Sequence, residues 1–142
     1  MAVVPALIDD SVVPGVGSPG AAVEALDASG RVVRPWGWYE ALARGDQYLV
    51  KRLWIQPGCR LSLQRHRHRA EHWVVVAGGG VLENAGQTIA ACVGTTLFIA
   101  TGAMHRASAG NEGLEIIEVQ RGMTLQESDI ERFADDFGRV PS

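Results

Sequence analysis

The chain has 142 residues, of which 46% are hydrophobic and 20% are charged, and its formal net charge is −3. This length and balance fit one folded domain and leave no room for a second catalytic domain. The negative charge argues against a protein that holds nucleic acid on a broad basic surface. No apolar run reaches the roughly 18 residues of a membrane span, and the start lacks the basic segment of a signal peptide, so we expect a cytoplasmic protein without membrane contact.

The chain divides into an N-terminal arm and a β-rich remainder. Residues 1–33 are rich in Gly, Pro, Ala and Val, and their turn formers interrupt any periodicity, so we expect an irregular arm with room for one short strand. Residues 34–142 form the expected domain, in which turn residues separate short β-like runs. The runs are 47–55, 61–67, 71–77, 80–83, 87–91, 95–100 and 114–120. Many short strands at this spacing predict a sandwich or barrel.

One helix signal stands near the C-terminus. Thr124 and Glu127 have the spacing of a capping box, in which the first side chain and the third helical residue bond each other's backbone. The sequence therefore predicts a short helix over 127–134, after an all-β domain.

Metal-binding side chains gather on one face of the expected strand 61–67. Residues two apart in a strand share a face, so Gln64, His66 and His68 project together and the intervening arginines project the other way. Glu71 follows closely, and His105 lies beyond a later glycine turn. Imidazole and carboxylate ligands suit Zn²⁺ and also admit Mn²⁺, Fe²⁺, Co²⁺ or Ni²⁺. The residues predict a site for one divalent ion, with Zn²⁺ favoured.

Two spaced motifs resemble those of the cupin superfamily. The first is Gly58-x5-Gln64-x-His66-x4-Glu71-x6-Gly78, and the second is Gly94-x5-Ala100-x-Gly102-x2-His105. Gln64 stands where the superfamily usually has its first histidine, and Ala100 replaces the usual proline. The resemblance implies a single-domain cupin, which is a double-stranded β-helix or jelly-roll barrel. It also implies that the metal ligands are Gln64, His66, Glu71 and His105.

The resemblance extends to a narrower family over about residues 34–139. Arg34-Pro-Trp-Gly, Leu61-Ser-Leu-Gln, Arg69-Ala-Glu-His-Trp and the tail from Asp129 to Arg139 are similar to the C-terminal domain of type II phosphomannose isomerases. That family interconverts mannose 6-phosphate and fructose 6-phosphate, often behind a fused mannose-1-phosphate guanylyltransferase domain. Residues 1–33 contain nothing that resembles a nucleotidyltransferase Gly-rich loop, so we expect this chain to lack the fusion partner.

The same resemblance assigns roles to other polar residues. Arg69 occupies the position of a family lysine two residues before the glutamate, which makes it the first candidate for substrate contact. His68 is then left outside the ligand set, facing the substrate or supporting the ligands. A phosphate dianion favours an Arg fork or a Lys ammonium, so Lys51, Arg69 and Arg106 are its candidates. Trp36 is expected in the core or as a platform at the pocket rim.

Several alternatives stay open at this stage. The general base is left among His68, His72, a carboxylate whose pKa is raised by burial, and a metal-bound hydroxide. Trp38 stands where the family usually has Ser or Thr, and its indole reshapes the pocket. The other functions are a metal-cupin activity on a different sugar, an Fe²⁺ oxygenase, or a non-catalytic sugar-binding module. We expect a small-molecule sugar phosphate as the ligand, and a homodimer to which the apolar arm contributes.

Overall fold

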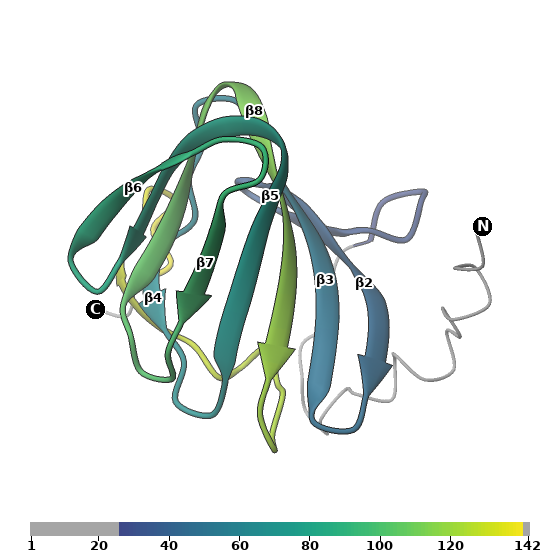
Figure 1. Cartoon of the computed structure of the whole chain (residues 1–142). Coiled ribbons are helices and arrows are strands. Elements are labelled where there is room, and N and C mark those ends of the chain that lie inside the picture. Colours follow the sequence, from purple (N-terminus) through teal and green to yellow (C-terminus); the bar gives the residue numbers. More distant parts are fainter. Residues whose placement is uncertain (1–25, 141–142) are drawn as a thin grey trace.

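Nine strands make up most of residues 26–140, the part of the chain that this computed structural model describes (Figure 1). No helix occurs among these residues. The strands are β1 (Val32–Arg34), β2 (Gly37–Gly45), β3 (Tyr48–Ile55), β4 (Leu63–Arg65), β5 (Ala70–Asn84), β6 (Gln87–Ala91), β7 (Thr96–Ile99), β8 (His105–Arg121) and β9 (Glu131–Ala134). The expected all-β barrel is confirmed.

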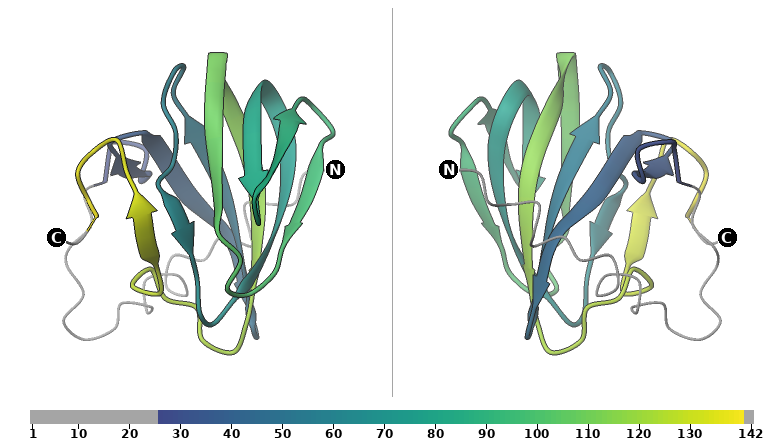
Figure 2. Two further views of the ribbon diagram at one scale, coloured as in Figure 1. Left: turned by 90° about the vertical axis from the view of Figure 1, so that its left-hand side faces the viewer. Right: turned by 90° about the vertical axis from the view of Figure 1, so that its right-hand side faces the viewer.

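Strands β5 and β8 form the spine of the barrel. They pair antiparallel from Ala70 opposite Arg121 to Asn84 opposite His105. Strands β3, β2 and β1 follow in order from one half of β8, while β4 and then β9 flank its other half. Strands β6 and β7 each pair with β5. The side views show these strands curving around one interior (Figure 2).

A glycine turn bends the spine. The β5–β8 register shifts between Val75 and Ala77 and again between Gly78 and Gly80. Gly78 has a φ of 74°, and a Cβ there would lie 2.1 Å from the Gly113 carbonyl oxygen, so glycine alone fits. The bend lets β5 pair with β7 before it and with β6 after it. The separately expected runs 71–77 and 80–83 are therefore one strand.

The interior is built by alternation along these strands. In β5, Glu71, Trp73 and Val75 are buried while the residues between them are exposed. In β8, Leu114 and Ile116 continue inward, and the next inward position is Glu118. Every second residue points inward because successive strand side chains alternate between faces. One end of the interior is therefore apolar and the other end carries buried polar groups.

The predicted helix over 127–134 is wrong. Residues Glu131–Ala134 form β9 instead, which pairs with β4. The Glu127 carboxylate pairs with Lys51 from β3 rather than with the backbone at Thr124. The Glu127 side chain, which a capping box would use, is thus paired with another strand, and residues 131–134 are extended along β4.

Most of the predicted arm, residues 1–33, lies outside the described residues. Its described end contributes Leu26, which bridges to Val32, and the start of β1, which pairs with β2. A domain boundary near residue 34 stays a prediction. Within residues 26–140, no helix is long and apolar enough to cross a membrane.

Candidate metal centre

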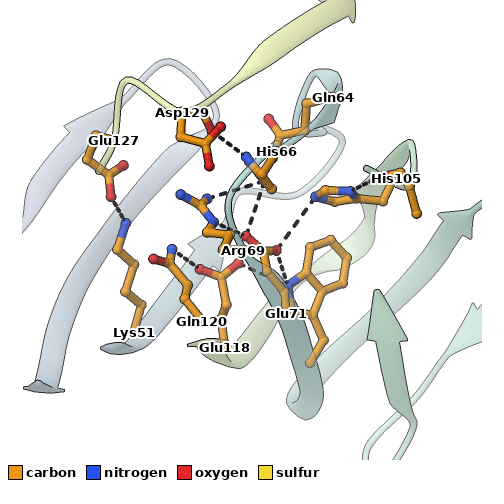
Figure 3. Close-up of polar contacts among 12 residues, drawn as sticks. Lys51, Gln64, His66, Arg69, Glu71, His105, Glu118, Gln120, Glu127 and Asp129 are labelled. Carbon is orange, nitrogen blue, oxygen red and sulfur yellow. Dashed lines mark hydrogen bonds and ion pairs between the residues drawn. The ribbon is translucent and has the colours of Figure 1, made fainter. Parts of the chain in front are cut away.

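Three buried side chains converge at the polar end of the interior. His66 follows β4, Glu71 is near the start of β5, and His105 begins β8 (Figure 3). The His66 Nε2 atom lies 3.1 Å from Glu71 Oε2, and His105 Nε2 lies 3.6 Å from Glu71 Oε1. One ligand atom from each residue falls within 4.8 Å of the others. The structure thus brings three of the four predicted ligands into one cluster.

Each imidazole is oriented by a backbone carbonyl. His66 Nδ1 donates to the Asp129 carbonyl at 2.7 Å, and His105 Nδ1 donates to the Ala103 carbonyl at 2.9 Å. With the proton on Nδ1, each ring turns its Nε2 lone pair toward Glu71. Burial lowers the pKa of His105, which favours the neutral ring that a metal needs. This arrangement is typical of histidines that ligate metals.

The fully buried His105 Nε2 atom has no hydrogen-bond partner. A buried nitrogen without a partner costs about 1–3 kcal/mol, so such atoms are uncommon unless a ligand satisfies them. Two ligand atoms bound to one tetrahedral ion at about 2.1 Å stand roughly 3.4 Å apart. The 3.1 and 3.6 Å separations to Glu71 bracket that spacing. The residues present therefore fit a divalent ion.

Glu71 is charged despite being buried. Burial opposes its ionisation, but its contact with His66 and the positive charge of Arg69 hold its pKa well below the usual range. Arg69 Nε donates to Glu71 Oε2 at 2.8 Å, and Arg69 Nη2 lies 3.2 Å from His66 Nε2. The Trp73 indole donates to Glu71 Oε1 at 3.2 Å. Glu71 is thus held as a carboxylate with fixed orientation.

Gln64 lies beside this cluster. It faces His105 across the β4–β8 pair, and its Oε1 accepts a hydrogen bond from Ser62 Oγ at 2.8 Å. An amide oxygen has a second lone pair, so this bond leaves one acceptor site open. The role of Gln64 as a fourth ligand stays a prediction.

A second buried carboxylate, Glu118, adjoins the centre. The Trp73 indole donates to its Oε2 at 2.9 Å, and Gln120 Nε2 donates to its Oε1 at 2.8 Å. Burial, together with the negative charge of Glu71, raises the pKa of Glu118 to about 7. The pKa values of two neighbouring carboxyl groups are thus shifted in opposite directions, and the direct contact of Arg69 with Glu71 contributes to the difference.

A basic pocket of about 100 Å³ opens next to the centre, lined in part by Gln64, Arg69 and Glu118. Lys51 lies on its wall, buried over the Tyr39 ring and paired with Glu127 (Figure 3). The remaining cations of its lining are Arg34, Arg132 and Arg139. The buried Arg132 Nε atom has no hydrogen-bond partner. The lining therefore carries more cationic than acidic side chains, although Lys51, Arg69 and Arg139 already pair with carboxylates.

Comparison with known proteins places the chain in a family. Residues 22–135 match the family model described as "Mannose-6-phosphate isomerase C-terminal". The chain belongs to this family. It is 44% identical to the alginate biosynthesis protein AlgA of Pseudomonas aeruginosa over 83% of this chain and 26% of that protein. It is 43% identical to the mannose-1-phosphate guanylyltransferase of Escherichia coli, over 83% and 27%. The chain thus spans about a quarter of the length of these relatives.

Solved structures agree on the fold. A cupin-2 domain from Rhodospirillum rubrum superposes with a TM-score of 0.56 at 18% identity, covering 65% of this chain and 67% of that chain. The capsular polysaccharide assembling protein CapF of Staphylococcus aureus gives a TM-score of 0.62 at 19% identity, covering 74% and 32%. Identities this low establish the cupin fold alone.

Of the further site residues predicted from the family resemblance, some line the pocket and others lie away from it. Arg69, Lys51 and Trp36 line the pocket, and Trp36 also packs in the core. His68 is exposed in a separate surface depression. Arg106 is buried, but its guanidinium donates to the carbonyls of Leu61 and Ala134, away from the pocket lining. The structure therefore brings neither His68 nor Arg106 to the centre.

Sequence reasoning missed four residues of the site: Glu118, Gln120, Glu127 and Asp129. A signal for the first two was present, since Glu118 and Gln120 occupy the inward positions of the run 114–120 in place of apolar residues. The patterns that contain Glu127 and Asp129, a capping box and a family tail motif, do not point to the centre, because the two residues reach it from a segment far along the chain.

Proposed function

We propose that this chain is a metal-dependent sugar-phosphate isomerase that interconverts mannose 6-phosphate and fructose 6-phosphate. The observation that carries the proposal is the buried, partnerless His105 Nε2, which faces the Glu71 carboxylate beside a pocket lined with cations. An ion site next to an anion site is what a metal-assisted reaction on a sugar phosphate requires. Membership of the isomerase family supports the same assignment.

His66, Glu71 and His105 would hold one divalent ion, with Gln64 as the fourth ligand. Zn²⁺ suits this mixed nitrogen and oxygen set, and Mn²⁺, Co²⁺, Ni²⁺ or Fe²⁺ are the alternatives. The ion would supply Lewis-acid stabilisation of the oxygen charge that develops at C1 and C2. Arg69 Nη2 lies 3.2 Å from His66 Nε2, so its guanidinium stands beside the nitrogen that would bind the ion.

The substrate phosphate would bind among the pocket cations. Arg132 pairs with Gln64 across β4–β9, and Gln64 pairs with His105 across β4–β8, so the three side chains form a row on one face. Two strand spacings separate Arg132 from His105 by roughly 10 Å. That span suits a sugar whose reacting carbons and phosphate lie at opposite ends. The Arg132 Nε atom, which has no hydrogen-bond partner, would donate a charge-assisted hydrogen bond to the phosphate. Lys51 is already paired with Glu127 and Arg139 with Asp135, so these two would add positive charge around the phosphate.

Glu118 is the group best placed to move the proton between C1 and C2. Its carboxyl is buried, lines the pocket and lies beside Glu71. A general base works best with a pKa near the operating pH, and the pKa of Glu118 is about 7. Trp73 and Gln120 fix both of its oxygens by hydrogen bonds. Glu118 thus corresponds to one of the candidate general bases, the carboxylate whose pKa is raised by burial.

A coupled assay tests the proposed function. The metal-reconstituted chain is given mannose 6-phosphate, with fructose 6-phosphate formation followed, alongside a chelator-treated sample and Glu118→Gln. We expect turnover that chelator abolishes, and a loss of about a hundredfold in kcat for the variant with its metal content unchanged. Absence of turnover in chain that holds metal stoichiometrically would sink the proposal. Turnover of another sugar phosphate alone, or sugar binding without turnover, would replace it with the corresponding alternative.

We further propose that two copies associate through the outer face of β5 and β7. This face exposes Val74, Val76 and Phe98, and the Phe98 ring contacts the His72 ring in a tilted arrangement with centroids 4.8 Å apart. Its edge arginine, Arg52, is already paired with Glu115 at 2.7 Å. Such a face is apolar and internally neutral, so an identical face meets it without like-charge repulsion.

Sedimentation of the chain and of Val74→Lys measures this association. We expect a dimer for the chain and a monomer for the variant. Met123→Lys, which replaces a side chain that is 86% exposed outside this face, should stay dimeric. A monomeric unmodified chain at micromolar concentration would contradict the proposal.

A further inference from the structure

A single residue outside the ligand set, Asp129, holds the metal-binding loop from three directions. Its backbone carbonyl accepts from His66 Nδ1 at 2.7 Å (Figure 3). One carboxylate oxygen accepts from the Arg67 backbone N–H at 2.8 Å, and the other accepts from the His68 backbone N–H at 2.9 Å. Asp129 lies more than sixty positions further along the chain than these partners. The contacts therefore tie the C-terminal segment to the loop between β4 and β5.

The contacts act on two of the ligands. The carbonyl bond selects the His66 tautomer whose Nε2 faces Glu71. The carboxylate bonds fix the backbone of residues 67–68, which lie between His66 and Glu71 in the chain. If this loop moves, the distance between the two ligand atoms changes. Asp129 thus controls both the direction and the spacing of the donors.

The same C-terminal segment touches the other walls of the site. The Gln126 carbonyl accepts from Arg69 Nη1 at 3.3 Å, and Glu127 pairs with Lys51. Strand β9 then pairs with β4 immediately before His66. Residues 126–134 therefore close one side of the centre, to which polar contacts and strand pairing join them.

We propose that Asp129 is a positioning residue that couples metal binding to docking of residues 126–131 on the barrel. The inference rests on the metal centre of the proposed function but not on the isomerase reaction. Because coupling between two events is reciprocal, docking of the segment strengthens metal binding, and a bound metal strengthens docking by the same factor. Loss of a residue that orients a metal ligand typically weakens metal binding by about 10–100-fold.

Cobalt titration of the metal-free full-length chain tests the first half of the coupling. The chain, Asp129→Ala and Asp129→Asn are titrated with Co²⁺, whose visible spectrum reports the ligand geometry. We expect Asp129→Ala, which keeps the carbonyl bond to His66 but loses both carboxylate bonds to the backbone of residues 67–68, to bind about tenfold more weakly with an altered spectrum. Asp129→Asn, which keeps one acceptor oxygen, should fall between it and the unmodified chain. Asp136→Ala is the matched control, because it removes an exposed ion pair with Arg60 from the same tail. It should bind cobalt within about twofold of the unmodified chain.

Hydrogen exchange tests the second half. Cobalt should slow amide exchange across residues 124–131 in the unmodified chain and in Asp136→Ala, and much less in Asp129→Ala. Equal cobalt affinity and spectrum in the unmodified chain and both Asp129 variants would overturn the inference. If Asp129→Ala does not fold, Asp129→Asn decides the question alone. Failure of the unmodified chain to bind cobalt would instead overturn the metal centre of the proposed function.

Discussion

The two ends of the barrel interior are built from the same strands yet differ in chemistry. Along β8, Leu114 and Ile116 face inward among apolar neighbours, and Glu118 and Gln120 occupy the next two inward positions. Along β5 the change runs from Val75 through Trp73 to Glu71. The backbone pattern is continuous, so the change in residue type does not arise from the fold. It marks the end of the barrel where buried polar residues, which form the candidate metal centre, replace the apolar residues of the core.

The hydrogen-bond partners of the two ends sharpen this contrast. At the polar end, Glu71 and Glu118 are each held by at least two donors. Two buried nitrogens there, His105 Nε2 and Arg132 Nε, have no hydrogen-bond partner among the described residues. Because His105 Nε2 also faces the Glu71 carboxylate in a cluster of three potential ligands, its open position is consistent with a bound ion.

The largest effect is expected from Glu71→Gln at the polar end. The change keeps the shape but removes the charge that the ion and Arg69 require, so kcat/KM should fall about a thousandfold, or roughly 4 kcal/mol. Steady-state kinetics with saturating metal measures it. Near-normal turnover in this variant would break the assignment of the polar end as the reaction centre.

At the apolar end, Ile116→Ala is expected to lower stability and to leave activity unchanged. Ile116 is completely buried, so the cavity left by truncation should lower the free energy of unfolding by about 2–5 kcal/mol. The metal content and kcat of the folded fraction should hardly change. Urea denaturation and kinetics on the same sample measure both quantities, and a loss of kcat at full folding would contradict the separation of the two ends.

The sequence predicted those features of the molecule whose signals lie in short stretches of the chain. Ligand types and spacings in the two motifs predicted His66, Glu71 and His105 because their convergence depends on barrel closure, which the cupin motifs specify. The β-like runs 47–55 and 114–120, which turn residues separate from their neighbours, predicted β3 and the second half of β8. The helix expected over 127–134 failed because a local capping pattern competed with partners on β3 and β4.

The residues that were not predicted act over long sequence distances. Asp129 contacts the centre through its backbone carbonyl, and a carbonyl carries no sequence signature. The inward position of Glu118 could be read from the run 114–120, but its raised pKa could not, because that shift depends on burial and on the nearby charge of Glu71 in the folded barrel. Arg69 and Arg106 were both candidates for the phosphate, with Arg69 the first candidate for substrate contact, and only the fold shows that Arg106 instead donates to the carbonyls of Leu61 and Ala134.

Smaller effects are expected from substituting Arg132 and Arg106, and they should differ in kind. Arg132→Gln should raise the KM for the sugar phosphate about tenfold with little change in kcat, because it removes a charged donor from the pocket. Arg106→Gln should leave KM unchanged and lower the free energy of unfolding by about 1–3 kcal/mol, since it loses buried hydrogen bonds to two carbonyls. If the two variants exchanged these effects, the pocket would be misplaced.

The most direct test is the metal content of the purified chain and of His105→Ala. Both are loaded with Zn²⁺, dialysed against metal-free buffer and analysed for metal and protein in the same sample. The centre described here predicts about one equivalent of metal in the unmodified chain and a large loss in the variant, which removes the one ligand whose buried nitrogen has no other partner. Equal metal in both, or none in a folded unmodified chain, would contradict it.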